Sequence, residues 1–423
     1  MSFFDELRWR GLIYDTTPGL EEAQRSEKLV AYVGFDPSAA SLHVGTLLPI
    51  MMLARFQRCG HTPITIVGGG TGLIGDPSGK ASERKLLSYE EVEANLKGIR
   101  RQLAHFLDFD APDNAARLVN NAEWLTSASL IEFLRDIGKY FTVNSMLARE
   151  SVKRRLASGD GLSFTEFSYS LLQAYDFLVL YDRHGCTLQM GGSDQWGNIT
   201  AGADLIRRLR GAKAYGLVAP LITTASGVKF GKTEAVTVWL DPERTSPYRF
   251  YQYWLNTDDR DVVAYLKFFT WLDRQAIAEM EQAVQEAAER RQAQRVLAEE
   301  LTRMSHGQAA LDRARRVSEL FFGSDVTQLA AREVMDVLGD APASEIPAAE
   351  VAEGGVGIVD LLVRAGLAAS KGDARRTLQG GGVYLNNQRL SDPNRRLTLA
   401  DAIDQKIFLL RKGKKSYHAV CLR

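Results

Sequence analysis

The chain has 423 residues, with 52 Lys or Arg and 52 Asp or Glu side chains. This length allows about two to four domains with separate cores, and the balance of charge excludes a chain that is basic or acidic throughout. Its three cysteines, Cys59, Cys186 and Cys421, form no C-x-x-C pair, so neither a disulfide framework nor a cysteine zinc site is indicated. No run approaches the roughly 18 apolar residues of a membrane span. We therefore expect a chain of the cytoplasm, without a membrane partner or a protein-held metal.

The first clear pattern is a buried strand, a turn and a helix. The apolar run 29–33 predicts the strand, residues 34–46 (GFDPSAASLHVGT) form the turn, and a helix follows over 47–56. Free backbone N–H groups at a helix start attract anions, so this turn could bind phosphate with His43 as a further donor. A surface turn whose His43 merely caps the helix explains these residues equally well. Pro49 lies inside the predicted helix, where a kink or a missing hydrogen bond is expected.

A second apolar strand begins at residue 64 and ends in the glycine-rich turn GGGTGLIGDPSGK, residues 68–80. Within it, residues 70–75 match G-x-G-x-x-G, the dinucleotide-binding fingerprint. That fingerprint places its last glycine in the opening turns of a helix, whereas residues 76–79, Asp-Pro-Ser-Gly, would interrupt one. Nicotinamide binding is therefore disfavoured, although a dinucleotide oxidoreductase stays among the alternatives.

Helical patterns then cover 88–107 and 121–139, and part of the second could form a subunit contact. The clearest helix start is at 163–166, where Ser-Phe-Thr-Glu fits the capping box S-x-x-E. The predicted helix 163–180 carries three polar residues at i, i+4 and i+7, and hence on one face: Tyr169, Gln173 and Asp176. Hydrogen-bonding groups in line on an otherwise apolar helix indicate a pocket for a polar ligand. Mutual hydrogen bonding in a core is the alternative.

Two further polar turns follow, GGSDQWGN at 191–198 and TTASGVKFGKT at 223–233. In the second, two lysines flank a glycine, one on each side. The segment 323–353 is acidic and contains two prolines, which predicts a partly ordered linker. The C-terminal module, 354–423, carries 13 Lys or Arg against 5 Asp or Glu, a net charge of +8, which leaves −8 on the rest. Such a module indicates a bound polyanion, unless it is only a solvated basic tail.

Together these motifs resemble the bacterial tyrosyl-tRNA synthetases, which are class I aminoacyl-tRNA synthetases, over nearly the whole chain. Residues 43–46, His-Val-Gly-Thr, are similar to the first class I signature, His-Ile-Gly-His, and residues 229–233, Lys-Phe-Gly-Lys-Thr, to the second, Lys-Met-Ser-Lys-Ser. GFDPSAASLHVG, GGGTGLIGDPSGK, SFTEFSYSLLQAYDF and GGSDQWGNIT resemble this family in particular. The chain departs from the signatures at Thr46, which replaces the second His, and at Phe230-Gly231, which replace Met-Ser.

The resemblance implies an α/β fold. A Rossmann-like parallel-sheet catalytic domain would occupy 1–246, an α-helical domain 247–322, an acidic linker 323–353 and a small α+β RNA-binding domain 354–423. The implied reaction, part of translation, activates L-tyrosine with ATP to tyrosyl-adenylate and pyrophosphate, and then transfers tyrosine to the terminal adenosine of tRNA(Tyr). ATP is a substrate, Mg²⁺ is expected to arrive with it, and no tightly bound cofactor is expected. Members of the family form homodimers, so the resemblance implies a homodimer here.

The resemblance also implies roles for single residues. The tyrosine-binding residues would be Tyr32, Asp76, Tyr169, Gln173, Asp176 and Gln195. The ATP-binding residues would be Gly34, Asp36, Ser38, His43, Gly45, Thr46, Gly192, Asp194 and Lys232. The catalytic residues would be His43, Lys229, Lys232 and Thr233. An amino-acid carboxylate is ionised at neutral pH and needs no general base, so catalysis would rest on positioning and on donors that meet charge on the pyrophosphate.

Three alternatives stay open at this point. One is an RNA-binding protein that kept an inactive synthetase body, which the presence of His43 and Lys232 disfavours. The second is the dinucleotide oxidoreductase. Within the family, the nearest alternative is a tryptophan-specific relative, against which Tyr32 and Asp176 argue.

Overall fold

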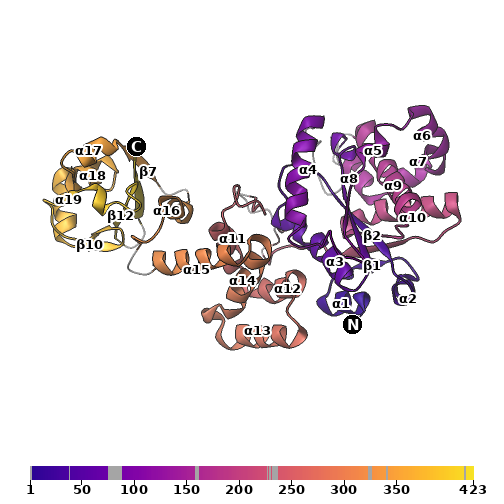
Figure 1. The fold of residues 1–423 in the computed structure, drawn as a ribbon, viewed down its shortest axis with the longest axis horizontal. Helices are drawn as coiled ribbons and strands as arrows, with labels where there is room; N and C mark the ends of the chain where they lie inside the picture. The colour runs from indigo at the N-terminus through magenta and orange to yellow at the C-terminus, as the bar shows by residue number, and fades with distance from the viewer. Residues whose placement is uncertain are drawn as a thin grey trace. The chain divides into compact units, whose positions relative to one another are not determined.

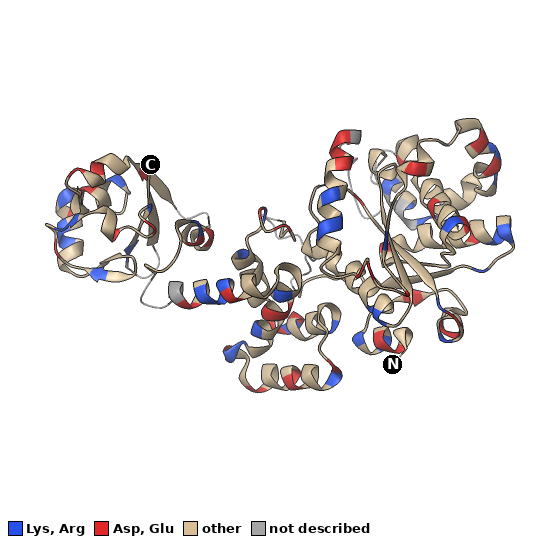
Figure 2. Ribbon diagram, viewed as in Figure 1, with Lys and Arg blue, Asp and Glu red and all other residues tan. Residues whose placement is uncertain are grey.

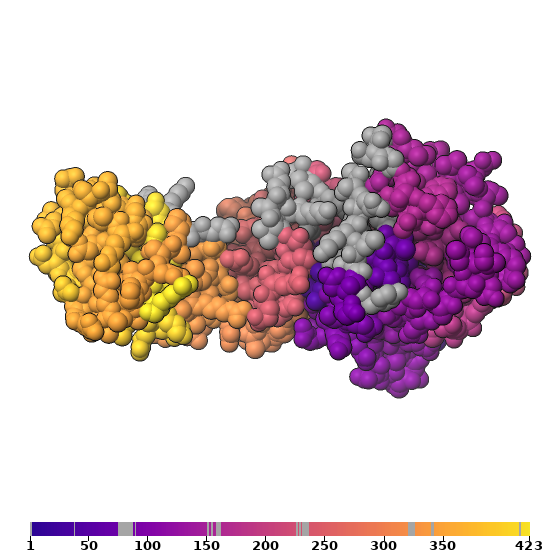
Figure 3. Space-filling model, turned by 90° about the horizontal axis from the view of Figure 1, so that it is seen from above, coloured from indigo at the N-terminus to yellow at the C-terminus, as the bar shows by residue number. Residues whose placement is uncertain are grey.

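The computed structural model describes residues 2–37, 39–74, 88–157, 162–225, 227, 230, 237–322, 326–339, 342–413 and 416–423. Figure 1 and Figure 3 show them coloured along the chain. The chain divides into two compact units. The first consists of Met1–Thr245 and Trp254–Ser305, and the second of Ser246–Tyr253 and His306–Arg423.

The first unit is built on a six-stranded sheet. Its strands are β1 (Asp15–Thr16), β2 (Val30–Phe35), β3 (Thr62–Val67), β4 (Arg117–Asn120), β5 (Leu188–Gly192) and β6 (Tyr215–Ala219). Their order is β1-β6-β5-β2-β3-β4, and every described pair is parallel except β1 with β6. The chain runs outward from β2 to β3 and β4, and β5 and β6 then lie on the other side of β2. A topological switch point therefore lies between β2 and β5, as the expected Rossmann-like fold requires.

Helices cover both faces of this sheet, which explains why every residue of β3 and β6 is buried. The helices of the first unit are α1 (Phe3–Arg10), α2 (Leu20–Ser26), α3 (Leu47–Arg58), α4 (Tyr89–Leu103), α5 (Ala122–Leu125), α6 (Leu130–Asp136), α7 (Val143–Leu147), α8 (Glu150–Ala157), α9 (Phe164–His184), α10 (Trp196–Arg210), α12 (Asp259–Phe269), α13 (Arg274–Ala287) and α14 (Gln292–His306). Helix α11 (Pro247–Leu255) contains residues of both units, and His306, the last residue of α14, belongs to the second. Figure 1 shows α3 on one side of the sheet and α9 with α10 on the other.

The helix predicted at residue 163 begins there, because the Ser163 hydroxyl accepts a hydrogen bond from the Glu166 N–H at 3.2 Å. By contrast, the helical stretch predicted over 121–139 is broken between α5 and α6. The Thr126 hydroxyl bonds the Ala122 carbonyl, and the Ser127 hydroxyl bonds the Glu123 and Trp124 carbonyls. Side chains that compete for backbone groups in this way favour a helix end over its continuation.

Pro49 causes no break in α3. A 3-10 turn, Val44–Thr46, comes first, and the α-helix begins at Leu47, which places Pro49 in its first turn. Backbone N–H groups of a first turn have no partner within the helix, so a proline there removes no hydrogen bond. The expectation of a kink or a missing hydrogen bond at Pro49 is therefore not met, because α3 continues through this residue to Arg58.

The second unit contains an α+β module. Its sheet has the order β10-β9-β12-β13-β7, and a separate pair joins β11 to β8. The strands are β7 (Ala343–Ile346), β8 (Val356–Gly357), β9 (Val383–Leu385), β10 (Gln388–Leu390), β11 (Arg396–Leu397), β12 (Ile407–Lys412) and β13 (Ser416–Leu422). The helices are α15 (Gln308–Phe322), α16 (Ala331–Leu338), α17 (Ala348–Ala352), α18 (Ile358–Arg364) and α19 (Lys371–Gln379).

The described part of the segment expected as a linker, 323–353, is folded. It contains α16, β7 and α17, and β7 pairs in parallel with β13. Val334 of α16 lies in one apolar cluster with Ile407 and Leu409 of β12. Composition indicated a linker because acidic side chains predominate, whereas the few apolar residues between them are the ones that are buried.

Candidate active site

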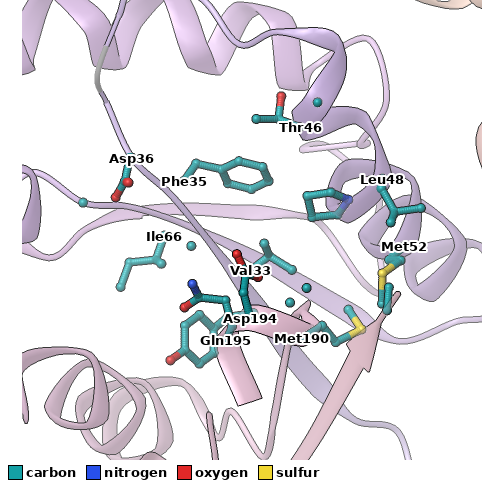
Figure 4. Close-up of a pocket in the computed structure, with 18 of the residues that line it drawn as sticks. Val33, Phe35, Asp36, Thr46, Leu48, Met52, Ile66, Met190, Asp194 and Gln195 are labelled. Carbon is teal, nitrogen blue, oxygen red and sulfur yellow. The ribbon is translucent and has the colours of Figure 1, made fainter. Parts of the chain in front are cut away.

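A cavity of about 420 Å³ opens at the carboxyl ends of the parallel strands, where the switch point lies. Figure 4 shows side chains that surround it. Twelve of the residues singled out from the sequence line it: Tyr32, Gly34, Asp36, His43, Gly45, Thr46, Tyr169, Gln173, Asp176, Gly192, Asp194 and Gln195. Five others lie outside the described residues: Ser38, Asp76, Lys229, Lys232 and Thr233.

Two buried polar groups, Tyr32 and Asp176, line this cavity. Tyr32 is 1% exposed, and among the described residues its hydroxyl has no hydrogen-bond partner. Burial raises the pKa of Asp176 to about 7. Burial and the nearby Asp176 charge raise the pKa of Tyr32 well above its ordinary value, so the phenol keeps its proton. An unpaired hydroxyl beside a titratable carboxyl group is a site for a ligand that carries its own hydroxyl.

Asp176 is held in place by Asn121 and Trp124, which the sequence analysis did not identify. Trp124 Nε1 donates to Asp176 Oδ1 at 2.7 Å, and Asn121 Nδ2 donates to Asp176 Oδ2 at 2.9 Å. Asn121 Oδ1 also accepts from the Gly70 N–H at 2.7 Å, which ties the glycine-rich turn to the site. A signal for Asn121 was present, because it directly follows β4 and so stands at the carboxyl edge of the sheet.

The described residues of the glycine-rich turn, 68–74, form no α-helix of the kind that the dinucleotide fingerprint opens. Its described part, up to Ile74, forms a 3-10 turn at Thr71–Leu73. Gly75, the last glycine of the match, lies outside the described residues. The turn binds Asn121 instead. The Gly70 N–H donates to Asn121 Oδ1, and the Thr71 hydroxyl accepts from Asn121 Nδ2 at 2.9 Å.

A second polar group joins α9 to the start of α10. Gln173 Nε2 donates to Gln195 Oε1 at 3.2 Å, and Asn198 Nδ2 donates to Gln173 Oε1 at 3.0 Å and to Gln195 Oε1 at 3.3 Å. Tyr169, 6% exposed, lines the cavity one helical turn before Gln173. Asn198, which the sequence analysis quoted in its motif without a role, thus orients two of the predicted tyrosine-binding residues.

His43 both caps its turn and lines the cavity, so the two readings of this residue are compatible. Its Nδ1 accepts from the Gly45 N–H at 3.0 Å, which leaves the ring proton on Nε2 as a donor. A Cβ on Gly45 would lie 2.8 Å from His43 Cε1, so a side chain there would displace the ring. The Thr46 hydroxyl donates to the His43 carbonyl at 2.7 Å. The threonine that departs from the signature therefore stabilises the turn.

Among the described residues that line the cavity, the groups that favour an anion are the starts of two helices. Helices α3 and α10 both begin at the carboxyl edge, after β2 and β5, where the positive ends of helix dipoles attract phosphate. The described lining has three carboxyl groups and no Lys or Arg: Asp36, Asp176 and Asp194. Phe230 also lines the cavity, and the lysines on either side of it in the sequence, Lys229 and Lys232, lie outside the described residues.

No group of three or more His, Cys, Asp or Glu side chains among the described residues is arranged to hold a metal ion. No helix in the described part of the chain is long and apolar enough to cross a bilayer.

The chain is similar to known proteins over its whole length. A family model described as tRNA synthetases class I (W and Y) matches residues 24–323, and one described as the tyrosine–tRNA ligase SYY-like C-terminal domain matches residues 340–420. A tyrosine–tRNA ligase of Roseiflexus castenholzii is 58% identical over 421 residues, which cover 100% of this chain and 99% of that protein. One of Bacillus caldotenax is 51% identical, with 99% of each chain covered. The crystal structure of a C-terminally truncated mitochondrial tyrosyl-tRNA synthetase of Aspergillus nidulans matches with a TM-score of 0.68 and 32% identity, over 75% of this chain and 93% of that one.

Proposed function

The chain belongs to the class I tRNA synthetases of the tryptophan and tyrosine group, and we propose that the cavity at the strand ends is where its reaction takes place. The reaction is that of a tyrosine–tRNA ligase: tyrosine is activated with ATP and then joined to tRNA. The single observation that carries the assignment of the cavity is the buried pair Tyr32 and Asp176. A pocket that ends in two polar groups suits a phenol and leaves them unpaired with phenylalanine.

In this proposal Tyr32 and Asp176 bind the phenol hydroxyl of tyrosine, and Gln195 lies near its carboxylate. Tyr169, Gln173 and Asp76 bind the ammonium group. The hydrogen bonds among Gln173, Gln195 and Asn198 support these roles, because they fix side chains that must present donors and acceptors in set directions. In this arrangement the Asp176 carboxyl group is ionised and accepts a hydrogen bond from the phenol hydroxyl of the bound tyrosine.

ATP would lie along the helix starts, with its parts bound by different segments. The residues after β2 and at the start of α3 would hold its adenosine and phosphates: Gly34, Asp36, Ser38, His43, Gly45 and Thr46. Gly192 and Asp194 would meet the ribose. His43, with its donor on Nε2, would stabilise charge on the departing pyrophosphate together with Lys229, Lys232 and Thr233. Mg²⁺ would come with ATP, since it is commonly bound through substrate phosphates and one or two carboxylates.

We further propose that the chain acts as a homodimer. Large apolar side chains of α6 and α7 are exposed in the isolated chain: Leu130 and Ile131 at 70%, Leu134 at 47%, Val143 at 61% and Leu147 at 40%. Phe164 at the start of α9 is 77% exposed. A cluster of this kind is costly in water and is typical of an interface. A second copy of the chain is the occupant that the family resemblance implies.

The C-terminal module would bind tRNA in the cytoplasm. In Figure 2 the ribbon of α19 and of the segment near β10 carries the blue of Lys and Arg residues. Arg375 and Arg376 of α19 are exposed, and residues 354–423 carry a net charge of +8. Basic side chains on a folded surface bind the phosphates of RNA and give the binding a strong dependence on salt.

The deciding experiment is exchange of labelled pyrophosphate into ATP. Exchange should require L-tyrosine, should not occur with L-tryptophan, and should fall sharply in Asp176→Ala. Exchange that does not depend on tyrosine would overturn the proposed site. A change in NADH absorbance with any hydroxy-acid substrate would instead favour the oxidoreductase, and tRNA binding without any exchange would favour an inactive synthetase body.

A further inference from the structure

Phe230 lies in the second signature, where the consensus has Met, and its side chain is 7% exposed. Its ring is surrounded by three aromatic side chains, which we call the aromatic socket: Trp254, Tyr265 and Phe269. The ring centroid of Phe230 lies 5.0 Å from that of Tyr265, 5.3 Å from that of Phe269 and 5.8 Å from that of Trp254. The Phe269 ring is nearly parallel to it, at an interplanar angle of 19°. These distances are those at which aromatic rings attract one another.

The backbone of Phe230 lies against the first signature. A Cβ on Gly45 would lie 3.4 Å from the Phe230 carbonyl oxygen, so little space separates the two segments. The Phe230 N–H donates to the Ile222 carbonyl at 3.1 Å, close to the end of β6. Phe230 is therefore fixed at three points: its ring, its N–H and the side that faces the turn of His43.

The socket is joined in turn to α3, the helix that starts after the first signature. Tyr265 and Phe269 are on α12, whose last carbonyl groups have no partner within the helix. Arg55 of α3, 1% exposed, donates to the Phe268 carbonyl at 2.9 Å and to the Thr270 carbonyl at 2.9 Å. Arg10 of α1 donates to the Lys267 carbonyl at 2.7 Å and to the Leu272 carbonyl at 2.8 Å.

Two buried guanidinium groups thus bind the end of α12, where the helix dipole also favours positive charge. Glu6 offsets part of their repulsion, since Arg10 Nε donates to Glu6 Oε1 at 2.6 Å. Arg55 lies within α3, and His43 precedes the 3-10 turn that leads into the same helix, so the end of α12 keeps a fixed position relative to the first signature. The socket, and with it Phe230, therefore keeps that position as well.

We propose that Phe230 is a positioning residue of the activation step, and that the aromatic socket holds the second signature, at Phe230, against the turn of the first signature. This rests on the proposed roles of Lys229 and Lys232, which immediately precede Phe230 and follow it by two residues. A lysine has a flexible side chain that is strongly hydrated, so an anchored backbone nearby reduces the entropy lost when it meets the phosphates. Phe230 does not itself touch the reacting atoms.

The first test compares Phe230→Ala with Phe230→Met in the full-length chain. Met fills an irregular apolar site and makes favourable sulfur–aromatic contacts, so it should keep most of the activity. Phe230→Ala should lower the rate of adenylate formation about 10- to 100-fold, as misplacement by roughly 1 Å does, and leave the tyrosine dissociation constant within about twofold. The matched control is Phe408→Ala, because Phe408 is also buried, at 0%, and lies in an apolar cluster of the second unit that contains no residue of the socket. Equal losses in both variants, or a loss confined to tyrosine binding, would overturn the proposal.

The second test asks whether Phe230 acts through the lysine. If it does, Phe230→Ala should cost little in a chain that already carries Lys232→Ala, because residues that act as a unit are not additive. Losses that multiply would refute the positioning role while leaving the role of Lys232 intact. An unchanged rate in Lys232→Ala alone would instead refute the proposed function. Thermal unfolding of each variant separates both outcomes from a failure to fold.

Discussion

Asn121 donates a hydrogen bond to Asp176 across 2.9 Å, and both side chains are almost fully buried. This contact joins the end of β4 to the middle of α9, two segments that are 55 residues apart in the sequence. It presents the carboxyl group to the cavity in one orientation. Several expectations follow from the fact that the substrate-binding groups are fixed by neighbours that do not bind substrate.

Asn121→Ala should weaken the selection of tyrosine over phenylalanine. The substitution removes a donor to Asp176 and leaves the Gly70 N–H and the Thr71 hydroxyl without this partner, at a cost of about 1–3 kcal/mol. We expect kcat/KM for tyrosine to fall at least about tenfold, with a smaller change for phenylalanine. Asn114→Ala is a suitable control, because Asn114 bonds the Gln57 and His61 carbonyls away from the cavity. An equal fall for both amino acids would contradict the expectation.

The titration of Asp176 should appear in the pH dependence of stability. Its pKa is raised from 3.8 to about 7 by burial, so between these values the folded chain holds a proton that the unfolded chain has lost. The free energy of unfolding should therefore fall as pH rises from about 4 to about 7 and be level above that range, with a slope of roughly 1 kcal/mol per pH unit from this group. Urea unfolding in the absence of tyrosine, measured for the unmodified chain and for Asp176→Asn, isolates the contribution of this carboxyl group to the free energy of unfolding. Parallel curves of unfolding free energy against pH for the two chains would exclude this contribution of Asp176.

Gly45→Ala should slow adenylate formation without weakening tyrosine binding. The new methyl group would lie 2.8 Å from His43 Cε1, so the imidazole ring has to move and its Nε2 donor moves with it. A displaced donor of this kind costs about 10- to 100-fold in rate. Stopped-flow measurement gives the rate and the tyrosine affinity separately. Gly197→Ala, where an added Cβ meets nothing within 4 Å, should behave as the unmodified chain.

Ile131→Asp should disrupt self-association. Ile131 is 70% exposed in the isolated chain, and a carboxylate placed in an apolar interface would be desolvated without a partner. Sedimentation at several protein concentrations should show a dimer for the unmodified chain and a shift toward monomer for the variant. Glu123→Gln, a change on the neighbouring helix α5, serves as the control. A monomeric unmodified chain would rule out the homodimer.

Replacing Arg375 and Arg376 together by Gln should weaken tRNA binding and leave pyrophosphate exchange unchanged. Each lost phosphate contact lowers the salt slope of log K by about one. Filter binding at several salt concentrations measures the slope, and Arg25→Gln on α2 is the control for a change of surface charge. An unchanged slope would favour the alternative of a solvated basic surface.

Local patterns in the sequence by themselves indicated the strand–turn–helix unit before His43 and the polar face of α9. The patterns were apolar runs, the capping serine at residue 163 and polar residues at helical spacing. The class of fold and the other predicted residues of the cavity came from the resemblance of the motifs to a known family. Local patterns also explain the wrong predictions. The hydroxyl groups of Thr126 and Ser127 interrupt the helix predicted over 121–139, and Pro49 is harmless because the helix begins at Leu47.

Only the tertiary structure decided which residues hold the functional ones. Asn121 meets Asp176, Arg55 binds the end of α12, and β7 pairs with β13 although composition indicated a linker. Partners such as these are far apart in the sequence, and no periodicity connects them. A buried donor bonds whichever acceptor the packed fold places within reach, because leaving either group unpaired costs more than the bond contributes. That choice is made by the packing of whole elements and is absent from any single stretch of sequence.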